Sequence, residues 1–380
     1  MMDFGWPAAV AERYDRLLYA VRAAFGDSTR PADQFYTRDD WSRLGELGIL
    51  GLSVPAAYGG GGLGALETSR MLEAFGRGCP DTGLVFGASA HLFACAMPIA
   101  EFASERIRKR VLPGMCDGQL IAGNAITEAD AGSDVSRLTV TATAVPGGYQ
   151  LNGTKSFVSN GPASDVFVTY ATTDPNAGHL GITGFVVERE TRGVEVGEPF
   201  EKMGLLSCPA GPVRFDDCFV PDDHVLGVPG QGGSIFQFSM GWERTCLFAG
   251  YLGLLDRLVE RCVGYARTRR QFGRRIGEFQ AVADRIVNMK LRLDSARLLM
   301  YRACWAMDNG GGSALDVALA KLAISEGAVA SALDAVQVFG GRGYLRADGI
   351  EAVLRDTVPS TIFSGTSDIQ RVLVAREMGL

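Results

Sequence analysis

The sequence is poor in the residues that build metal sites and disulfide frameworks. It contains only three histidines, which lie far apart in the chain, and its eight cysteines include no C-x-x-C pair. No spacing typical of zinc binding is present. Scattered free thiols are typical of a reducing compartment. We therefore expect neither a metal site nor disulfides, and a cytoplasmic location.

Positive charge and long apolar runs are also scarce. The net charge is −6, whereas a general nucleic-acid binder needs a basic face, so that class of protein is excluded. We expect no apolar run to reach the roughly 18 residues of a membrane helix. The opening MMDFGWPAAVAERYDRLL predicts a mixed amphipathic helix rather than a secretory signal. We expect a protein that acts without nucleic acid or membrane.

The composition that remains is ordinary for a globular protein. Hydrophobic residues make up 47% of the 380 positions and charged residues 21%, and the length allows two or three domains. Helical spacing of apolar residues fills residues 1–120. Alternating segments follow in 121–232, and long helical runs occupy 233–380. The sequence predicts an α+β protein with an N-terminal helical domain, a middle antiparallel β-barrel or sandwich, and a C-terminal four-helix bundle.

Local signals refine this order. Thr37 followed by Asp40 predicts a capping box at the start of a helix. Gly147–Gly148 and Asn152–Gly153 each predict a β-hairpin turn. Two amphipathic runs of nearly thirty residues, joined by glycines, predict antiparallel neighbours in a bundle. The basic segment from Glu105 to Arg110 is interpreted as a solvated helix face.

A lone carboxylate, Glu243, stands in the apolar run FQFSMGWERTCLFAG. Apolar surroundings disfavour the charged form of a carboxyl group and raise its pKa, and a general base needs a pKa near the working pH. Glu243 is therefore a candidate catalytic base. The alternative is a helix-surface carboxylate that pairs with Arg244 or with Arg257.

Four further segments carry candidate binding residues. Residues 125–136, AITEADAGSDVS, form a hydroxyl-rich loop suited to the polar edge of a flat heterocycle. Residues 153–161, GTKSFVSNG, offer an aromatic ring and a hydroxyl. The arginine cluster that starts at Arg269 suits a pyrophosphate, and the glycines of QVFGGRGY and IFSGTSDIQR let backbone approach a ligand. Each segment alone is more often a simple turn; together and in this order they are hard to explain that way.

The domain order and these segments resemble the acyl-CoA dehydrogenase family of flavoproteins over nearly the whole chain. The resemblance implies FAD held in extended form between the β domain and the C-terminal bundle of a homotetramer or dimer. It places the flavin contacts of one subunit on Thr127, Gly132, Ser133, Phe157 and Ser159. It places contacts from a neighbouring subunit on Arg269, Gln271, Phe272, Gln337, Gly340 and Gly341, and further flavin contacts on Thr366 and Asp368.

The resemblance also assigns the catalytic base. Many family members carry a glutamate directly before the Gly-Thr of the last motif, where this chain has Ser364. A hydroxyl cannot replace that base unaided. A minority branch, which includes isovaleryl- and long-chain-type enzymes, takes its base from the helix that opens the bundle, and that position is Glu243. The backbone N–H of Ser364 would then bind the thioester oxygen of the substrate.

Within the family, SMGWERTCLF, MKLRLDSARLLMYRACW, GASAHLFACAMPI and VPSTIFSGTSDIQ are most similar to L-prolyl carrier-protein dehydrogenases. This implies oxidation of a carrier-bound prolyl thioester to pyrrole-2-carboxyl in antibiotic biosynthesis, with electrons passed to an electron-transfer flavoprotein or to oxygen. The residues Arg106 to Arg110 are a candidate docking surface for an acidic carrier. Two alternatives stay open: a short- or branched-chain acyl-CoA dehydrogenase of isovaleryl type, and a flavin-free helical scaffold that serves as a binding module.

Overall fold

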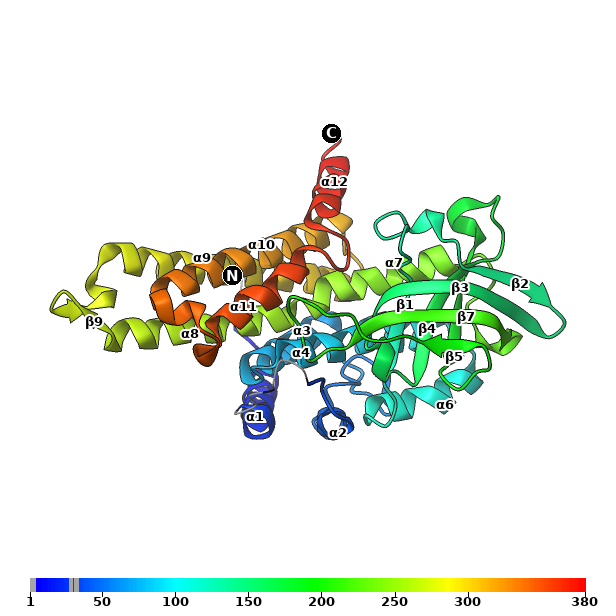
Figure 1. Cartoon of the computed structure of the whole chain (residues 1–380), viewed down its shortest axis with the longest axis horizontal. Coiled ribbons are helices and arrows are strands. Elements are labelled where there is room, and N and C mark those ends of the chain that lie inside the picture. Colours follow the sequence, from blue (N-terminus) through cyan, green and yellow to red (C-terminus); the bar gives the residue numbers. More distant parts are fainter. Residues whose placement is uncertain (1–4, 27–29, 31–33) are drawn as a thin grey trace.

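The computed structural model describes residues 5–26, 30 and 34–380. Figure 1 shows an elongated molecule with a twisted sheet at one end and a bundle of long helices reaching to the other. The N-terminal helices lie across the middle, against both parts. The predicted order of helices, sheet and helices is confirmed. Residues 1–4, where the predicted N-terminal amphipathic segment begins, lie outside the described residues.

The described residues of the N-terminal part form six α-helices. They are α1 (Ala8–Phe25), α2 (Arg38–Glu46), α3 (Ala65–Gly78), α4 (Thr82–Ala90), α5 (Met97–Phe102) and α6 (Glu105–Cys116). The predicted capping box is confirmed: the Thr37 side chain accepts from the Asp40 N–H, and the Asp40 carboxylate accepts from the Thr37 N–H. A wide π-turn, His91–Ala96, joins α4 to α5 without a break.

The expectation that no apolar run reaches membrane length is wrong for two stretches. Thr82–Phe102 and Ala314–Tyr344 are long and apolar enough to cross a membrane by length and composition. In the first, 94% of the apolar window is buried inside the protein, and in the second 50%. A helix enclosed by other elements needs no polar face, so apolar length alone does not separate a core helix from a spanning one.

Eight strands form one sheet at the right of Figure 1. Its order is β6-β7-β3-β2-β4-β5-β8, and β1 adds to β4. Most pairs are antiparallel, as predicted, but β1 pairs with β4 in parallel, with Ala122 opposite Val166, so the sheet is mixed. The strands are β1 (Ala122–Ala125), β2 (Thr141–Val145), β3 (Gly148–Ser159), β4 (Val166–Thr172), β5 (Ile182–Glu188), β6 (Val194–Val196), β7 (Ala210–Pro221) and β8 (Val225–Leu226).

Of the two predicted hairpin turns, one is confirmed and one is wrong. Val145 pairs with Gly148 across the β2–β3 turn, where Gly147 has φ +83°. Asn152–Gly153 instead lies inside β3, at a bulge where the pairing with β7 shifts register. A Cβ at Gly153, which has φ +130°, would lie 2.9 Å from the Val140 side chain. A bulge and a tight turn both favour glycine, so the sequence signal is the same for both.

The C-terminal part is helical and continues from α7. The elements are α7 (Gly232–Trp242), α8 (Ala249–Thr268), the short strands β9 (Arg270–Gln271) and β10 (Arg274–Arg275), α9 (Gln280–Asp308), α10 (Ala314–Phe339), α11 (Ile350–Thr357) and α12 (Ser367–Glu377). The two long predicted helices are α9, with 29 residues, and α10, with 26. Asp308, the last residue of α9, accepts from the N–H groups of Ala65 and Leu66 at the start of α3. This cap ties the bundle to the N-terminal helices. All eight cysteines are free and buried.

Candidate active site

Glu243 lies where α7 meets α8, at the start of a π-turn that spans Glu243–Leu247. Such wide turns occur often at functional sites. The side chain is only 7% exposed. Its Oε1 lies 3.3 Å from Ser239 Oγ, and its Oε2 accepts from Ser364 Oγ at 2.7 Å. The carboxyl group is therefore held on both oxygens by hydroxyl groups.

Burial raises the pKa of Glu243 to about 7, although the Ser364 hydrogen bond, the charge of Arg244 and the Ser239 hydroxyl each lower it. The alternative of a surface ion pair is wrong. Arg257 lies elsewhere and donates to the backbone carbonyl of Gly76. A carboxyl group with a pKa near 7 is divided between its acid and base forms at neutral pH, which suits proton transfer.

Ser364 is fixed at its other end by Arg244. The Arg244 Nε donates to the Ser364 carbonyl oxygen at 2.9 Å. Ser364 has φ +52° and Gly365 has φ +87°, so two successive residues adopt the left-handed region that is costly for a non-glycine residue. The Ser364 N–H meets no acceptor among the described residues, which leaves it available to a ligand oxygen.

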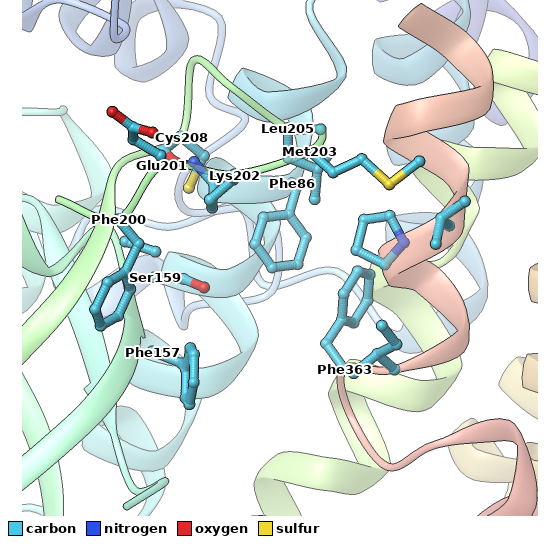
Figure 2. A pocket seen from close by; sticks show the side chains of 15 residues that line it. Phe86, Phe157, Ser159, Phe200, Glu201, Lys202, Met203, Leu205, Cys208 and Phe363 are labelled. Atoms are coloured by element: carbon cyan, nitrogen blue, oxygen red, sulfur yellow. Dashed lines mark hydrogen bonds between the residues drawn. The ribbon is translucent and has the colours of Figure 1, made fainter. Parts of the chain in front are cut away.

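An apolar cavity of about 360 Å³ lies beside this loop, within the roughly 300–1,000 Å³ typical of small-molecule sites. Figure 2 shows Phe157, Ser159 and Phe200 on the sheet side and Phe86 and Phe363 facing them. Phe86 and Phe363 pack with ring centroids 4.6 Å apart. Phe363 lines the cavity, and its neighbour Ser364 donates to Glu243. The carboxyl group is therefore separated from the cavity by one residue of the wall.

The cavity fits a flat, largely apolar ring system such as a flavin. Phe157 is 62% exposed on its wall and has φ +55°. A costly backbone conformation is typical of functional positions, and a flat ligand on the exposed ring would remove apolar surface from water. Ser159, two residues on, adds a hydroxyl to the same wall. These residues would hold the ring, and the adjacent loop, with Thr127 and Ser133, would meet its polar edge.

The structure brings the first group of predicted flavin contacts to one region of the sheet. Ser156 N–H donates to the Thr127 carbonyl at 2.7 Å, which joins the Thr127 loop to β3 directly before Phe157. Thr127 is half-buried, whereas Gly132 and Ser133 are exposed. All five predicted residues of this group therefore belong to the sheet end of the molecule.

The second group lies at the opposite end of the same chain. Figure 1 shows β9 at the far tip of the bundle, away from the sheet. Arg269, Gln271 and Phe272 are exposed there, Phe272 to 93%. The rings of Tyr265 and Phe339 stack 4.2 Å apart and hold the ends of α8 and α10 together. This places the exposed residues Gln337, Gly340 and Gly341 in the same region. One chain alone does not bring the two groups together.

The remaining predicted contacts follow Ser364. Thr366 caps α12, since its hydroxyl accepts from the Ile369 N–H. Asp368 is almost fully exposed and lies 3.7 Å from Arg371. The cations of the basic segment on α6 have partners in their own chain: Arg106 pairs with Asp223 at 2.8 Å and Arg110 with Glu188. That pairing agrees with a solvated helix face.

Sequence reasoning missed a buried ion pair beneath the Thr127 loop. Lys155 Nζ lies 2.7 Å from Glu128 Oε1 and 3.1 Å from the carbonyl of Ile126. Glu128 also accepts from the N–H groups of Thr139 and Val140. Both residues stand inside segments already singled out, ITEADAG and GTKSFV. The sequence signal that could have revealed the ion pair was an ionisable residue at a buried position of a strand.

Family models for the N-terminal, middle and C-terminal domains of acyl-CoA dehydrogenase match residues 14–119, 123–218 and 230–379. The chain belongs to the acyl-CoA dehydrogenase family. Within this family it is 57% identical to an L-prolyl peptidyl-carrier-protein dehydrogenase of Pseudomonas fluorescens Pf-5, over 91% of this chain and 92% of that protein. It is 45% identical to the protein of the same name from a Serratia species, over 93% and 91%. A solved structure of PigA with FAD and proline superposes with a TM-score of 0.97 and 42% identity, covering both chains fully.

Proposed function

We propose that this acyl-CoA dehydrogenase family member is an FAD-dependent enzyme that oxidises an L-prolyl thioester on a peptidyl carrier protein to the pyrrole-2-carboxyl thioester. The observation that carries the proposal is Glu243: a buried carboxyl group with a pKa of about 7, held beside an apolar cavity, in a chain 57% identical to a prolyl dehydrogenase. Bound FAD would supply the hydride acceptor.

The proposed chemistry starts at the carbon next to the thioester carbonyl. That carbonyl makes the neighbouring C–H bond acidic, and Glu243 in its base form removes the proton. The free N–H of Ser364 stabilises the negative charge that develops on the carbonyl oxygen. The apolar walls around Phe86 and Phe363 exclude water and strengthen both interactions. Converting a prolyl to a pyrrolyl group removes four hydrogens, so two two-electron oxidations are needed. In the first, the α proton goes to Glu243 and a hydride would leave the β carbon for bound FAD. Because the α carbon then carries no hydrogen, the second proton and hydride come from the remaining ring positions, after the electron acceptor has been reoxidised.

The proposed assembly is a homotetramer or dimer. Its support is the position of β9: Arg269, Gln271 and Phe272 lie at the opposite end of the chain from the Thr127 loop (Figure 1). A neighbouring copy would bring them to the cofactor, with the arginine against the pyrophosphate. An electron-transfer flavoprotein or oxygen would then reoxidise the flavin. We propose a cytoplasmic enzyme of antibiotic biosynthesis.

Purified protein should be offered the prolyl group on a carrier protein and, separately, on coenzyme A. We expect a loss of four hydrogens from the carrier-bound substrate by mass spectrometry and slow or no turnover of the CoA thioester. Isovaleryl-CoA tests the alternative of a branched-chain acyl-CoA dehydrogenase. Oxidation of isovaleryl-CoA with no change in the prolyl carrier would overturn the proposed substrate, and a purified protein without bound flavin would overturn the proposed reaction.

A further inference from the structure

Ser364 lies far from Glu243 in the sequence, yet its side chain contacts the Glu243 carboxylate. The Ser364 hydroxyl donates to Glu243 Oε2 at 2.7 Å across 121 residues of sequence. The Glu243 contact to Ser239 is longer, at 3.3 Å, and the Ser239 hydroxyl also lies 3.3 Å from the Phe93 carbonyl. The stronger of the two hydroxyl contacts is therefore the one from Ser364.

The backbone of Ser364 is held rigidly enough to aim this hydroxyl. Arg244 Nε donates to its carbonyl oxygen at 2.9 Å, and Gln370 Nε2 donates to the carbonyl of Gly365. On the other side, the Phe363 ring packs against Phe248 with centroids 5.3 Å apart. A left-handed serine persists only where its surroundings impose the conformation, and these contacts impose it.

Among the described residues, two other groups favour the ionised form of Glu243, the more distant Ser239 hydroxyl and the charge of Arg244. Cys95 approaches from the π-turn His91–Ala96 and Tyr170 from β4, and burial raises the pKa of both well above the physiological range. Both therefore stay neutral at the pH where Glu243 changes charge. Arg244 is the cation that faces Glu243, and its guanidinium is directed to the Ser364 carbonyl rather than to the carboxylate.

We infer that Ser364 is a positioning residue for the proton-transfer step: its hydroxyl fixes the orientation of Glu243 and stabilises the base form, while Arg244 holds Ser364 in place. The inference rests on the proposed dehydrogenation and adds to it a role for the hydroxyl. The hydroxyl therefore acts on the reaction through Glu243 and not on the substrate itself.

The test is the pH profile of flavin reduction by the prolyl carrier protein in Ser364→Gly, Ser364→Ala and the wild type, from about pH 5 to 9. Glycine suits the positive φ, so this variant should fold, but it removes the whole hydroxymethyl group. Alanine removes only the hydroxyl. A hydrogen bond to the charged form of a carboxyl group lowers its pKa, so loss of the Ser364 hydroxyl raises the pKa of Glu243. We expect the acidic limb to move upward by about one unit in both variants, with a rate about fivefold lower at pH 7, about tenfold lower at pH 6 and below, and recovery at high pH.

Thr361→Ala is the matched control, because the Thr361 hydroxyl belongs to the same loop but donates locally to the Val358 carbonyl. Its acidic limb should coincide with that of the wild type. The inference is overturned if Ser364→Gly keeps the wild-type limb, or loses the same fraction of rate at every pH, since a merely structural role gives that result. If wild-type protein fails to reduce its flavin with the prolyl carrier at any pH, it is the proposed function that fails.

Discussion

Lys155 and Glu128 form an ion pair at 2.7 Å with both side chains almost fully removed from solvent. The lysine also reaches the carbonyl of Ile126, one residue before Thr127. Burial lowers the pKa of Lys155 to about 8, whereas the lysine charge and the Thr139 contacts hold that of Glu128 below its usual value. The pair therefore fixes the loop whose next residues are the predicted flavin contacts.

Removing the lysine charge alone from this ion pair should destabilise the fold. In Lys155→Met the carboxylate of Glu128 loses its counter-charge inside the protein, and we expect a loss of about 3–5 kcal/mol in the free energy of unfolding. Urea unfolding followed by circular dichroism measures this, and gel filtration followed by absorbance at flavin wavelengths measures the FAD retained. We expect both to fall.

The double variant Lys155→Met/Glu128→Gln provides the control for that experiment. Neutralising the carboxylate removes the isolated charge, so the double variant should be more stable than Lys155→Met alone. If the effects of Lys155→Met and of Glu128→Gln alone simply add in the double variant, the pair is not coupled and the loop is held in another way.

Glu243→Gln should stop the reductive reaction without unfolding the protein. Glutamine has nearly the same shape and can still accept from Ser364, but it cannot take the substrate proton. A general base contributes about 10²–10⁴-fold to a rate, and we expect a loss in that range. The measurement is stopped-flow bleaching of the flavin by the prolyl carrier protein. Complete bleaching at the wild-type rate would remove Glu243 from the role of base.

The same substitution should stabilise the fold at alkaline pH. The folded-state pKa of Glu243, about 7, is raised above that of an unfolded glutamate. Its contribution to stability is therefore fully present below about pH 4.5 and is lost as the pH rises through 7. We expect Glu243→Gln to exceed the wild type by about 1–3 kcal/mol at pH 8 and to match it near pH 4. Thermal melts at the two pH values check this, and an equal difference at both would contradict it.

Arg269→Ala should weaken the retention of FAD while leaving the fold intact. Arg269 is exposed at the end of α8, so little packing is lost, whereas a charge-assisted contact to pyrophosphate is removed. We expect a lower ratio of flavin to protein after desalting. Arg192→Ala, which removes an exposed arginine from the sheet end, is the matched control. Equal cofactor content in the two variants would count against the pyrophosphate contact.

An apolar stripe on α9 should lie in the interface of the proposed oligomer. Leu291, Leu298 and Trp305 are seven residues apart along the helix and each is more than half exposed, which an isolated soluble chain rarely tolerates as a continuous strip. We expect Leu298→Glu/Trp305→Ser to lower the mass measured by light scattering and to release FAD. Tyr19→Ser, at an exposed aromatic on α1, should do neither. Retention of the wild-type mass would exclude this stripe from the interface.

Prediction from the sequence succeeded where the signal was local. The Thr37–Asp40 capping box and the long helices α9 and α10 depend on residues a few positions apart, and they are confirmed. The burial of Glu243 followed from the apolar residues on either side of it. The prediction of a hairpin turn at Asn152–Gly153 was wrong, because a bulge within β3 uses the same glycine. Only the pairing with β7 distinguishes a bulge from a turn.

What the sequence could not show depends on contacts between distant segments. Ser364 and Glu243 are 121 positions apart, and nothing in either segment specifies that the hydroxyl and the carboxylate meet. The apolar helix Thr82–Phe102 is membrane-like by composition, and only its neighbours in the fold account for it. The residues predicted to contact FAD remain predictions, although their grouping at two ends of the chain is now evident (Figure 1).

The position of β9 at the tip of the bundle has a consequence for handling the protein. In the proposed assembly each cofactor is completed by a second copy, so flavin supply and protein concentration act on the same equilibrium. Dilution should release FAD from the enzyme and so lower its absorbance at flavin wavelengths. Adding riboflavin to the culture of the expression host should raise the yield of assembled oligomers. A preparation with little bound flavin would then indicate dissociated subunits before it indicated a damaged catalytic centre.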